Sequence, residues 1–195
     1  DLINNHIIEN SIQGKAQIKD AKIRFHKDVD AVNTKSLDIF FKDNRLHFNL
    51  MEPMFKDKKL DGSFVLINNL TSEKNGQVDV FLKTNSKLDK DILDILKAYN
   101  ITLPIIQKNG NTQASLLMKF PYDTTKNMST YGEFFLNDAK VAINNFEFES
   151  KNAEVILDDS IIKIKNSDFK YKDMIFATLN LNLDIKTLKS YGDAN

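Results

Sequence analysis

A ten-residue phrase that begins with glycine occurs twice in the chain, and it points to a fold built from β-strands. The copies run from Gly14 to Ile23 and from Gly132 to Val141, with the shared pattern Gly-x-x-x-[Ile/Leu]-x-Asp-Ala-Lys-[Ile/Val]. A weaker echo spans residues 62–69. Glycine followed by alternating apolar residues and a short polar break is typical of a strand that ends in a bulge or turn. The recurrence predicts a strand-based unit that is used more than once.

Alternation of apolar and polar residues continues through most of the chain and is most regular in ATLNLNLDI, from Ala177 to Ile185. Short turn signals rich in Asn and Asp separate these stretches, such as Lys42-Asp43-Asn44 and Asp158-Asp159. Such short turns favour antiparallel neighbours. We therefore predict a mainly β fold, a long antiparallel meander curved into an open groove or taco-like sheet. Few aromatic or branched residues occupy the polar positions of this alternating pattern. The pattern therefore predicts a sheet with one dry face and one wet face.

One segment departs from this pattern and predicts a single α-helix near residues 87–99. Its apolar residues fall on one helical stripe that should pack on the sheet, with Ser86 as the expected N-cap; the stripe comprises Leu88, Ile92, Ile95, Leu96 and Tyr99. The helix divides two strand blocks, 10–85 and 101–188. We interpret residues 1–195 as a single β-rich segment of a larger protein.

Charge and composition exclude several classes of function. The chain has 27 basic and 27 acidic residues and no cysteine. A neutral chain without a basic excess argues against nucleic-acid binding. The longest apolar runs are four residues, whereas a membrane-spanning helix needs about 20. Because the chain begins with Asp1 rather than Met, we expect targeting signals and any anchor to lie outside it.

No group of residues in the sequence predicts catalysis. The three histidines, His6, His26 and His47, are 20 and 21 residues apart, which matches no metal-ligand spacing. We expect His26 and His47 to lie on the polar face of strands. Gly-rich phosphate loops and nucleophile elbows are absent. The expectation is a protein that is not an enzyme and that uses no metal and no cofactor.

The apolar stripes of the second half are the remaining functional candidates. Two interpretations stay open for them: they line a slot for a greasy ligand, or they fill an ordinary core. The candidate residues are Phe134, Leu136, Phe146, Phe148, Val155, Leu157, Ile162, Ile164, Phe169, Tyr171, Leu179, Leu181 and Leu183.

Three phrases of the second half carry a resemblance to a known family: LPIIQKNGNTQASLLMKFP, GEFFLNDAKVAI and IKIKNSDFKYKDMIFATLNLNLDI. They resemble the AsmA-like proteins of Gram-negative bacteria, in particular the YhdP-type and TamB-type members. The resemblance covers about 101–185, and 14–69 more loosely. It implies a curved, tube-like groove of β-strands in a periplasmic body, an N-terminal membrane anchor, and a role in moving phospholipid between the two membranes. This chain departs from the pattern because it is shorter and lacks the anchor.

The resemblance and the stripes together predict a segment that binds lipid acyl chains along an apolar β-groove. It would support phospholipid transport or outer-membrane homeostasis in the periplasm, anchored to the inner membrane through a segment not present here. The expected partners are a phospholipid or another acyl-chain ligand and possible envelope proteins, with membrane contact through parts outside this segment. The alternative is a closed-core structural or protein-interaction domain of the envelope that binds no ligand.

Overall fold

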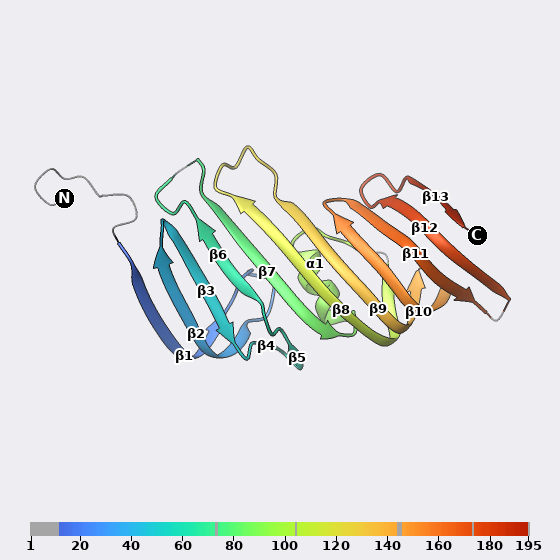
Figure 1. The fold of residues 1–195 in the computed structure, drawn as a ribbon, viewed down its shortest axis with the longest axis horizontal. Helices are drawn as coiled ribbons and strands as arrows, with labels where there is room; N and C mark the ends of the chain where they lie inside the picture. The colour runs from blue at the N-terminus through green and yellow to red at the C-terminus, as the bar shows by residue number, and fades with distance from the viewer. Residues whose placement is uncertain (1–11, 73, 104, 144–145, 173, 195) are drawn as a thin grey trace, which may run out of the picture. The chain divides into compact units, whose positions relative to one another are not determined.

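A computed structural model of the chain describes residues 12–72, 74–103, 105–143, 146–172 and 174–194. Within these ranges it contains thirteen β-strands and one α-helix (Figure 1). The strands before the helix are β1 (Gly14–Ile23), β2 (Val32–Lys42), β3 (Arg45–Met51), β4 (Met54–Phe55), β5 (Lys58–Lys59), β6 (Phe64–Asn68) and β7 (Gln77–Ser86). The helix is α1 (Lys90–Ala98). The strands after it are β8 (Ile105–Pro121), β9 (Ser129–Ile143), β10 (Phe146–Asp158), β11 (Ile161–Tyr171), β12 (Ile175–Asp184) and β13 (Ser190–Ala194).

The strands form one open sheet whose order largely follows the sequence. The order is β13-β12-β11-β10-β9-β8-β7-β6-β3-β2-β4-β5, and β1 pairs with β2. Pairs such as β9 with β10 and β11 with β12 are antiparallel. Short turns between consecutive strands account for this arrangement, because they can join only antiparallel neighbours. The prediction of a mainly β, antiparallel and open sheet with one helix is confirmed.

The chain gathers into two compact units. The first unit contains the described residues up to Ile23, Val32–Leu82 and Leu117–Ser129. The second unit contains Arg24–Ala31, Lys83–Leu116 and the residues from Thr130 onward. The division therefore differs from the two strand blocks drawn on either side of the helix, because the end of β8 clusters with the first unit.

One face of the first unit is an apolar core. A row of register partners crosses β2, β3, β6 and β7, and it consists of Ile39, Phe48, Val65 and Val80. Register partners in antiparallel strands point to the same side of the sheet. Val65 and Val80 of this row are buried. The alternation in the sequence thus places the apolar residues at every second position of these strands in the core.

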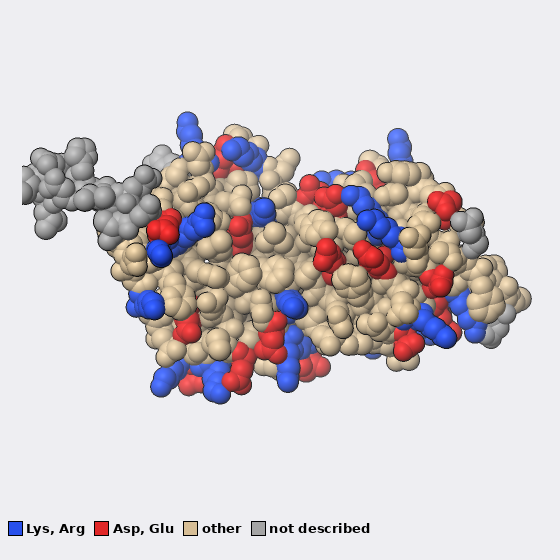
Figure 2. Space-filling model, in the orientation of Figure 1, with Lys and Arg blue, Asp and Glu red and all other residues tan. Residues whose placement is uncertain are grey.

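The other face of the first unit carries aromatic rings as well as polar side chains. The ring of His47 lies 5.3 Å from that of Phe64, and the ring of Phe64 stacks 5.1 Å from that of Phe81. Figure 2 shows the charged side chains over β6 and β7 lying mostly toward the strand ends. The second face of this unit is therefore mixed, because the rings share it with polar residues such as Asn68 and Asp79, which are hydrogen-bonded to each other.

The aspartate of the repeated phrase adopts the same unusual conformation in both copies. Asp20 has a φ of 51° and Asp138 a φ of 44°, both in the left-handed region. Asp and Asn tolerate this region better than most residues. The prediction that each phrase ends its strand is wrong, because β1 and β9 continue through the aspartate. The backbone irregularity itself lies at the predicted polar break.

A line of such residues crosses the second unit. Gly110 in β8 and Asn166 in β11 also have positive φ, at 83° and 41°. A side-chain carbon at Gly110 would collide with the carbonyl oxygen of Asp138, so only glycine fits there. Along β9 the buried residues are even-numbered before this line, at Phe134 and Leu136. After the line the most deeply buried residues are odd-numbered, at Ala139 and Val141. The same face therefore stays apolar on both sides of the line although the sequence alternation shifts by one residue.

Asp138→Val is expected to lower the free energy of unfolding by about 1–2 kcal/mol, because a β-branched residue is strained at positive φ. Asp138→Gly should leave stability within about 0.5 kcal/mol of the parent, since glycine adopts this conformation freely. Asn137→Val, one residue earlier in ordinary strand conformation, is the matched control. Urea unfolding of the three variants measures the difference. Equal losses for Asp138→Val and Asn137→Val would show that the φ of Asp138 costs nothing.

Helix α1 belongs to the second unit and is buried there through the predicted stripe. Leu88, Ile92, Ile95, Leu96 and Tyr99 are all buried. The carboxylate of Asp89 accepts from the N–H groups of Asp91 and Ile92, so Asp89 is the N-cap and the prediction of Ser86 is wrong. Asp89 offers a carboxylate next to the positive end of the helix, which a serine lacks.

The position of α1 is fixed by contacts to its neighbours in the second unit. The N–H of Leu88 donates to Oε1 of Gln107 in β8 at 2.8 Å, and the ring of Tyr99 lies 5.2 Å from that of His26. Figure 1 draws the helix behind β8 and β9. Leu116 of β8 and Phe134 of β9 are buried, and both side chains lie next to Gly132. The helix thus covers the apolar face of these two strands.

Candidate functional site

The register of β9 to β12 gathers the apolar candidates onto a single face of the second unit. One row of partners runs from Phe134 through Val155 and Ile164 to Leu181. A second row joins Leu157, Ile162 and Leu183. Partners in these rows share a face. We call this side, which carries both rows, the inner face.

The four aromatic candidates lie on the same inner face beyond the line of positive-φ residues. Strand β12 contains no positive-φ residue, so its alternate residues stay on one side. Its partners Phe169 and Tyr171 in β11 therefore share a face with Ile162 and Ile164. The ring of Tyr171 lies 5.6 Å from Phe148 and 5.9 Å from Phe146, and Phe148 lies 6.4 Å from Phe169.

Exposure of the inner face increases from β9 toward β12. The buried candidates are Phe134, Leu136, Leu157 and Ile162. The half-buried candidates are Phe148, Val155, Ile164, Phe169, Tyr171, Leu179, Leu181 and Leu183. Phe146 is 55% exposed. The inner face is thus closed beside the helix and accessible along β12.

No described inner-face position of β9 to β12 carries a charge. The hydroxyl of Ser167, which lies on this face, is satisfied by the carbonyl of Lys165 at 2.8 Å and the N–H of Glu154 at 3.1 Å. The hydroxyl of Ser150 is buried without a hydrogen-bond partner among the described residues. A surface of this kind offers contact to hydrocarbon and little to a charged group.

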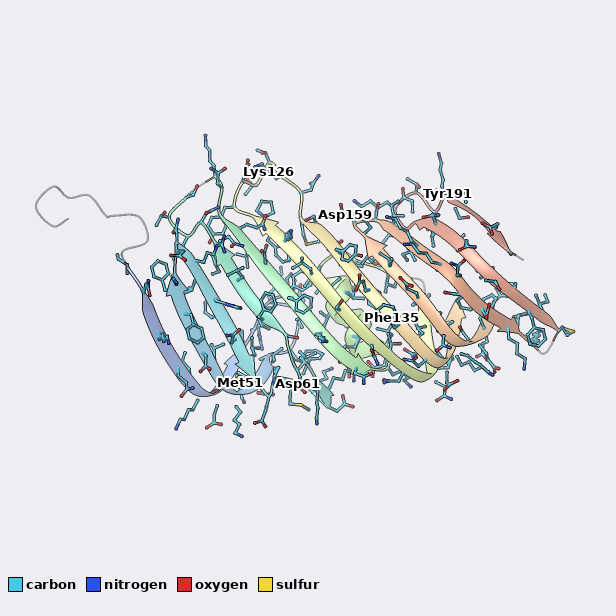
Figure 3. The ribbon with its side chains drawn as sticks, in the orientation of Figure 1. Met51, Asp61, Lys126, Phe135, Asp159 and Tyr191 are labelled. Carbon is cyan, nitrogen blue, oxygen red and sulfur yellow. The ribbon has the colours of Figure 1, made fainter. Side chains whose placement is uncertain are left out.

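The outer face of the same strands carries the charges, and these pair with each other. Lys140 lies 3.1 Å from Glu147 and 3.6 Å from Glu149, and the hydrogen bond to Glu147 raises the pKa of its ammonium. Lys163 donates to Asp158 at 2.7 Å, which raises its pKa as well. Exposed pairs of this kind contribute little to stability. Phe135 on β9, which Figure 3 labels, is an exposed apolar residue on this outer face.

A hollow of about 860 Å³ crosses β8 to β12 near the line of positive-φ residues. Among the thirteen candidates only Phe169 lines it; the other lining residues are Asn109, Asp138, Ala139, Lys140, Glu149, Ser150, Lys151, Asn152, Asp168, Lys170, Phe176, Ala177 and Thr178. Lysines and carboxylates alternate around it, and Asp168 accepts from Thr178 at 2.6 Å. This hollow was not among the predicted sites, although charges of alternating sign at 138–140, 149–151 and 168–170 were a signal for it in the sequence.

Two further observations concern metals and membranes. Within the described ranges, no three His, Asp or Glu side chains come together as a metal site would require. In the same ranges, no helix has the length and hydropathy that crossing a bilayer would demand.

Comparison with known proteins supplies the family. The YhdP protein family model matches residues 3–195, almost the whole chain. No curated protein and no solved structure matches it. The match extends the resemblance seen in the strand-and-turn phrases of the second half to the N-terminal strands. The chain therefore belongs to the YhdP protein family, the AsmA-like type of envelope protein.

Proposed function

We propose that this segment binds lipid acyl chains along the inner face of β9 to β12 and thereby supports phospholipid transport or outer-membrane homeostasis. The observation that carries the proposal is an apolar, uncharged face that is closed beside α1 and accessible along β12. Membership of the YhdP family supports the same assignment. Binding is passive and requires no catalytic group.

The dimensions and chemistry of the inner face suit an acyl chain. Strand β12 has 10 residues and spans about 33 Å, longer than an extended acyl chain. Each methylene removed from water on such a face contributes about 0.8 kcal/mol. Because the face lacks charged groups, a chain gains similar contacts at neighbouring positions. It therefore slides along the strands without a single tight site.

The cellular setting belongs to the proposal as well. We place the segment in the periplasm, attached to the inner membrane through chain outside residues 1–195. Its ligand is a phospholipid or another acyl-chain molecule, and envelope proteins are its candidate protein partners.

The closed-core alternative is favoured by one specific observation. Phe134, Leu136 and Leu157 are almost completely buried, as in an ordinary structural core. If the chain beyond this segment covers β12 in the same way, the inner face has no room for a ligand. The segment would then be a structural or protein-interaction domain of the envelope.

Leu181→Asp separates the two functions. In an accessible face the carboxylate stays hydrated, so the variant should fold but lose uptake of a fluorescent phospholipid. Asn182→Asp adds the same charge on the outer face, and this control should bind lipid as the parent does. Circular dichroism reports folding and fluorescence titration reports uptake.

The remaining outcomes decide between the alternatives. A folded Leu181→Asp protein that binds phospholipid as well as the parent would remove β12 from the site. A Leu181→Asp protein that unfolds, together with a parent that takes up no lipid, would favour the closed-core domain.

A further inference from the structure

The inner face ends at the turn between β11 and β12, and a lysine lies at that end. Lys172 follows Tyr171, the last residue of β11, and has a φ of 47°. Its ammonium lies 5.3 Å from the centre of the Tyr171 ring. Tyr171 is an inner-face residue, so the charge of Lys172 stands at the rim of the apolar face.

No carboxylate among the described residues neutralises the charge of Lys172. It is exposed, and among the described residues its recorded contact is the ring of Tyr171, with no carboxylate against it. Lysines of the outer face differ in this respect, since Lys140 and Lys163 are held by Glu147 and Asp158. An ammonium over an aromatic ring keeps its affinity for anions while its stem covers apolar surface.

A continuous aromatic path leads inward from Lys172. The rings of Tyr171 and Phe146 are in contact at the rim, and Phe148 and Phe169 follow further in. Phe146 and Ile175 remain exposed at 55% and 56%. An amphiphile that lies on this path has its chain on the rings and its head beside the ammonium. An uncharged face with a cation at its end is therefore complementary to a molecule with an apolar tail and an anionic head.

Resting on the acyl-chain function above, we propose that Lys172 binds the phosphate of a phospholipid headgroup while the acyl chain lies over Tyr171, Phe146 and Phe148. The rim of the β11–β12 turn is thus a headgroup site, and it prefers acyl ligands with an anionic head over neutral ones. Inorganic phosphate shares the anionic chemistry but lacks the tail, so it binds there much more weakly.

The test compares two fluorescent ligands with identical acyl chains, a phosphatidylglycerol and an uncharged diacylglycerol. Lys172→Glu should weaken phosphatidylglycerol binding by roughly three- to tenfold and leave diacylglycerol unchanged. Lys172→Gln should give a smaller loss, and the effect should shrink at high salt. Lys186→Glu reverses a charge in the turn after β12, and this control should bind both ligands as the parent does. Thermal unfolding confirms that each variant is folded.

The other outcomes overturn the headgroup site in distinguishable ways. If Lys172→Glu changes both ligands equally or neither, Lys172 does not contact the headgroup, and acyl binding by the parent still stands. If inorganic phosphate displaces phosphatidylglycerol at equal concentration, the site recognises anions without regard to the tail. If the parent binds neither ligand, the acyl-chain function fails and the headgroup site fails with it.

Discussion

Leu157→Asp is expected to unfold the second unit at room temperature. The side chain of Leu157 is 0% exposed and lies between Gly132 of β9 and Ile162 of β11. A carboxylate there has no partner and no access to water, which costs at least about 4 kcal/mol. A typical domain is stable by only about 5–15 kcal/mol, so this loss is a large part of its stability.

Circular dichroism and urea unfolding measure the loss. Leu157→Met is the matched control, because it keeps the volume and should cost less than about 1.5 kcal/mol. A Leu157→Asp protein with the parent's unfolding midpoint would mean that water reaches this part of the inner face. If the Leu157→Asp protein unfolds and the Leu181→Asp protein folds, the inner face is closed at β10 and accessible at β12.

Leu96→Ala should lower the free energy of unfolding by about 2–5 kcal/mol, since Leu96 is only 2% exposed and its loss leaves a cavity under α1. Lys97→Ala removes an exposed side chain one residue later and should cost no more than about 0.5 kcal/mol. Chemical denaturation of both variants gives the comparison. Near-zero losses for Leu96→Ala would show that the helix is peripheral and does not cover the inner face.

The turns and the helix were predictable because local chemistry decides them. Asp43 and Asn44 between β2 and β3, and Asp159 between β10 and β11, have positive φ at the predicted turns. Asn and Asp favour these conformations through their own backbone hydrogen bonds. The apolar stripe of α1 was predictable for a similar reason, since the period of a helix is visible in a single segment.

The cap of the helix and the mid-strand irregularities could not be predicted with the same certainty. Ser86 and Asp89 are both acceptable caps, and the choice depends on where β7 ends. At Asp138 the chain takes a turn-like conformation while the register with β10 is the same on both sides of it, and at Asn166 the register with β12 shifts between Ile164 and Ser167. The polar residues at these positions, taken alone, predict the end of a strand. The strands continue because pairing with β10 and with β12 is present on both sides of these residues.

Alternation predicted which residues of each strand half are apolar, but it did not predict their exposure. Within each half of a strand the candidates share one parity, so the sequence could place them together there, whereas the shift of parity at the positive-φ residues could not be predicted. Whether a given residue is buried depends on which element covers it. Phe134 lies where α1 packs and is buried, whereas Phe146 lies near a strand end and is exposed. The position of the Lys172 ammonium over the ring of Tyr171 is a side-chain contact that the sequence does not specify.

Site-specific photo-crosslinking in the full-length protein tests acyl-chain binding on the inner face most directly. A benzophenone amino acid is introduced at Leu181 on the inner face and, separately, at Asn182 on the outer face of β12. After irradiation, mass spectrometry detects lipid bound covalently to the protein. Binding along the inner face predicts phospholipid adducts at residue 181 and none at residue 182. Equal adducts at both positions, or none at residue 181, would contradict it.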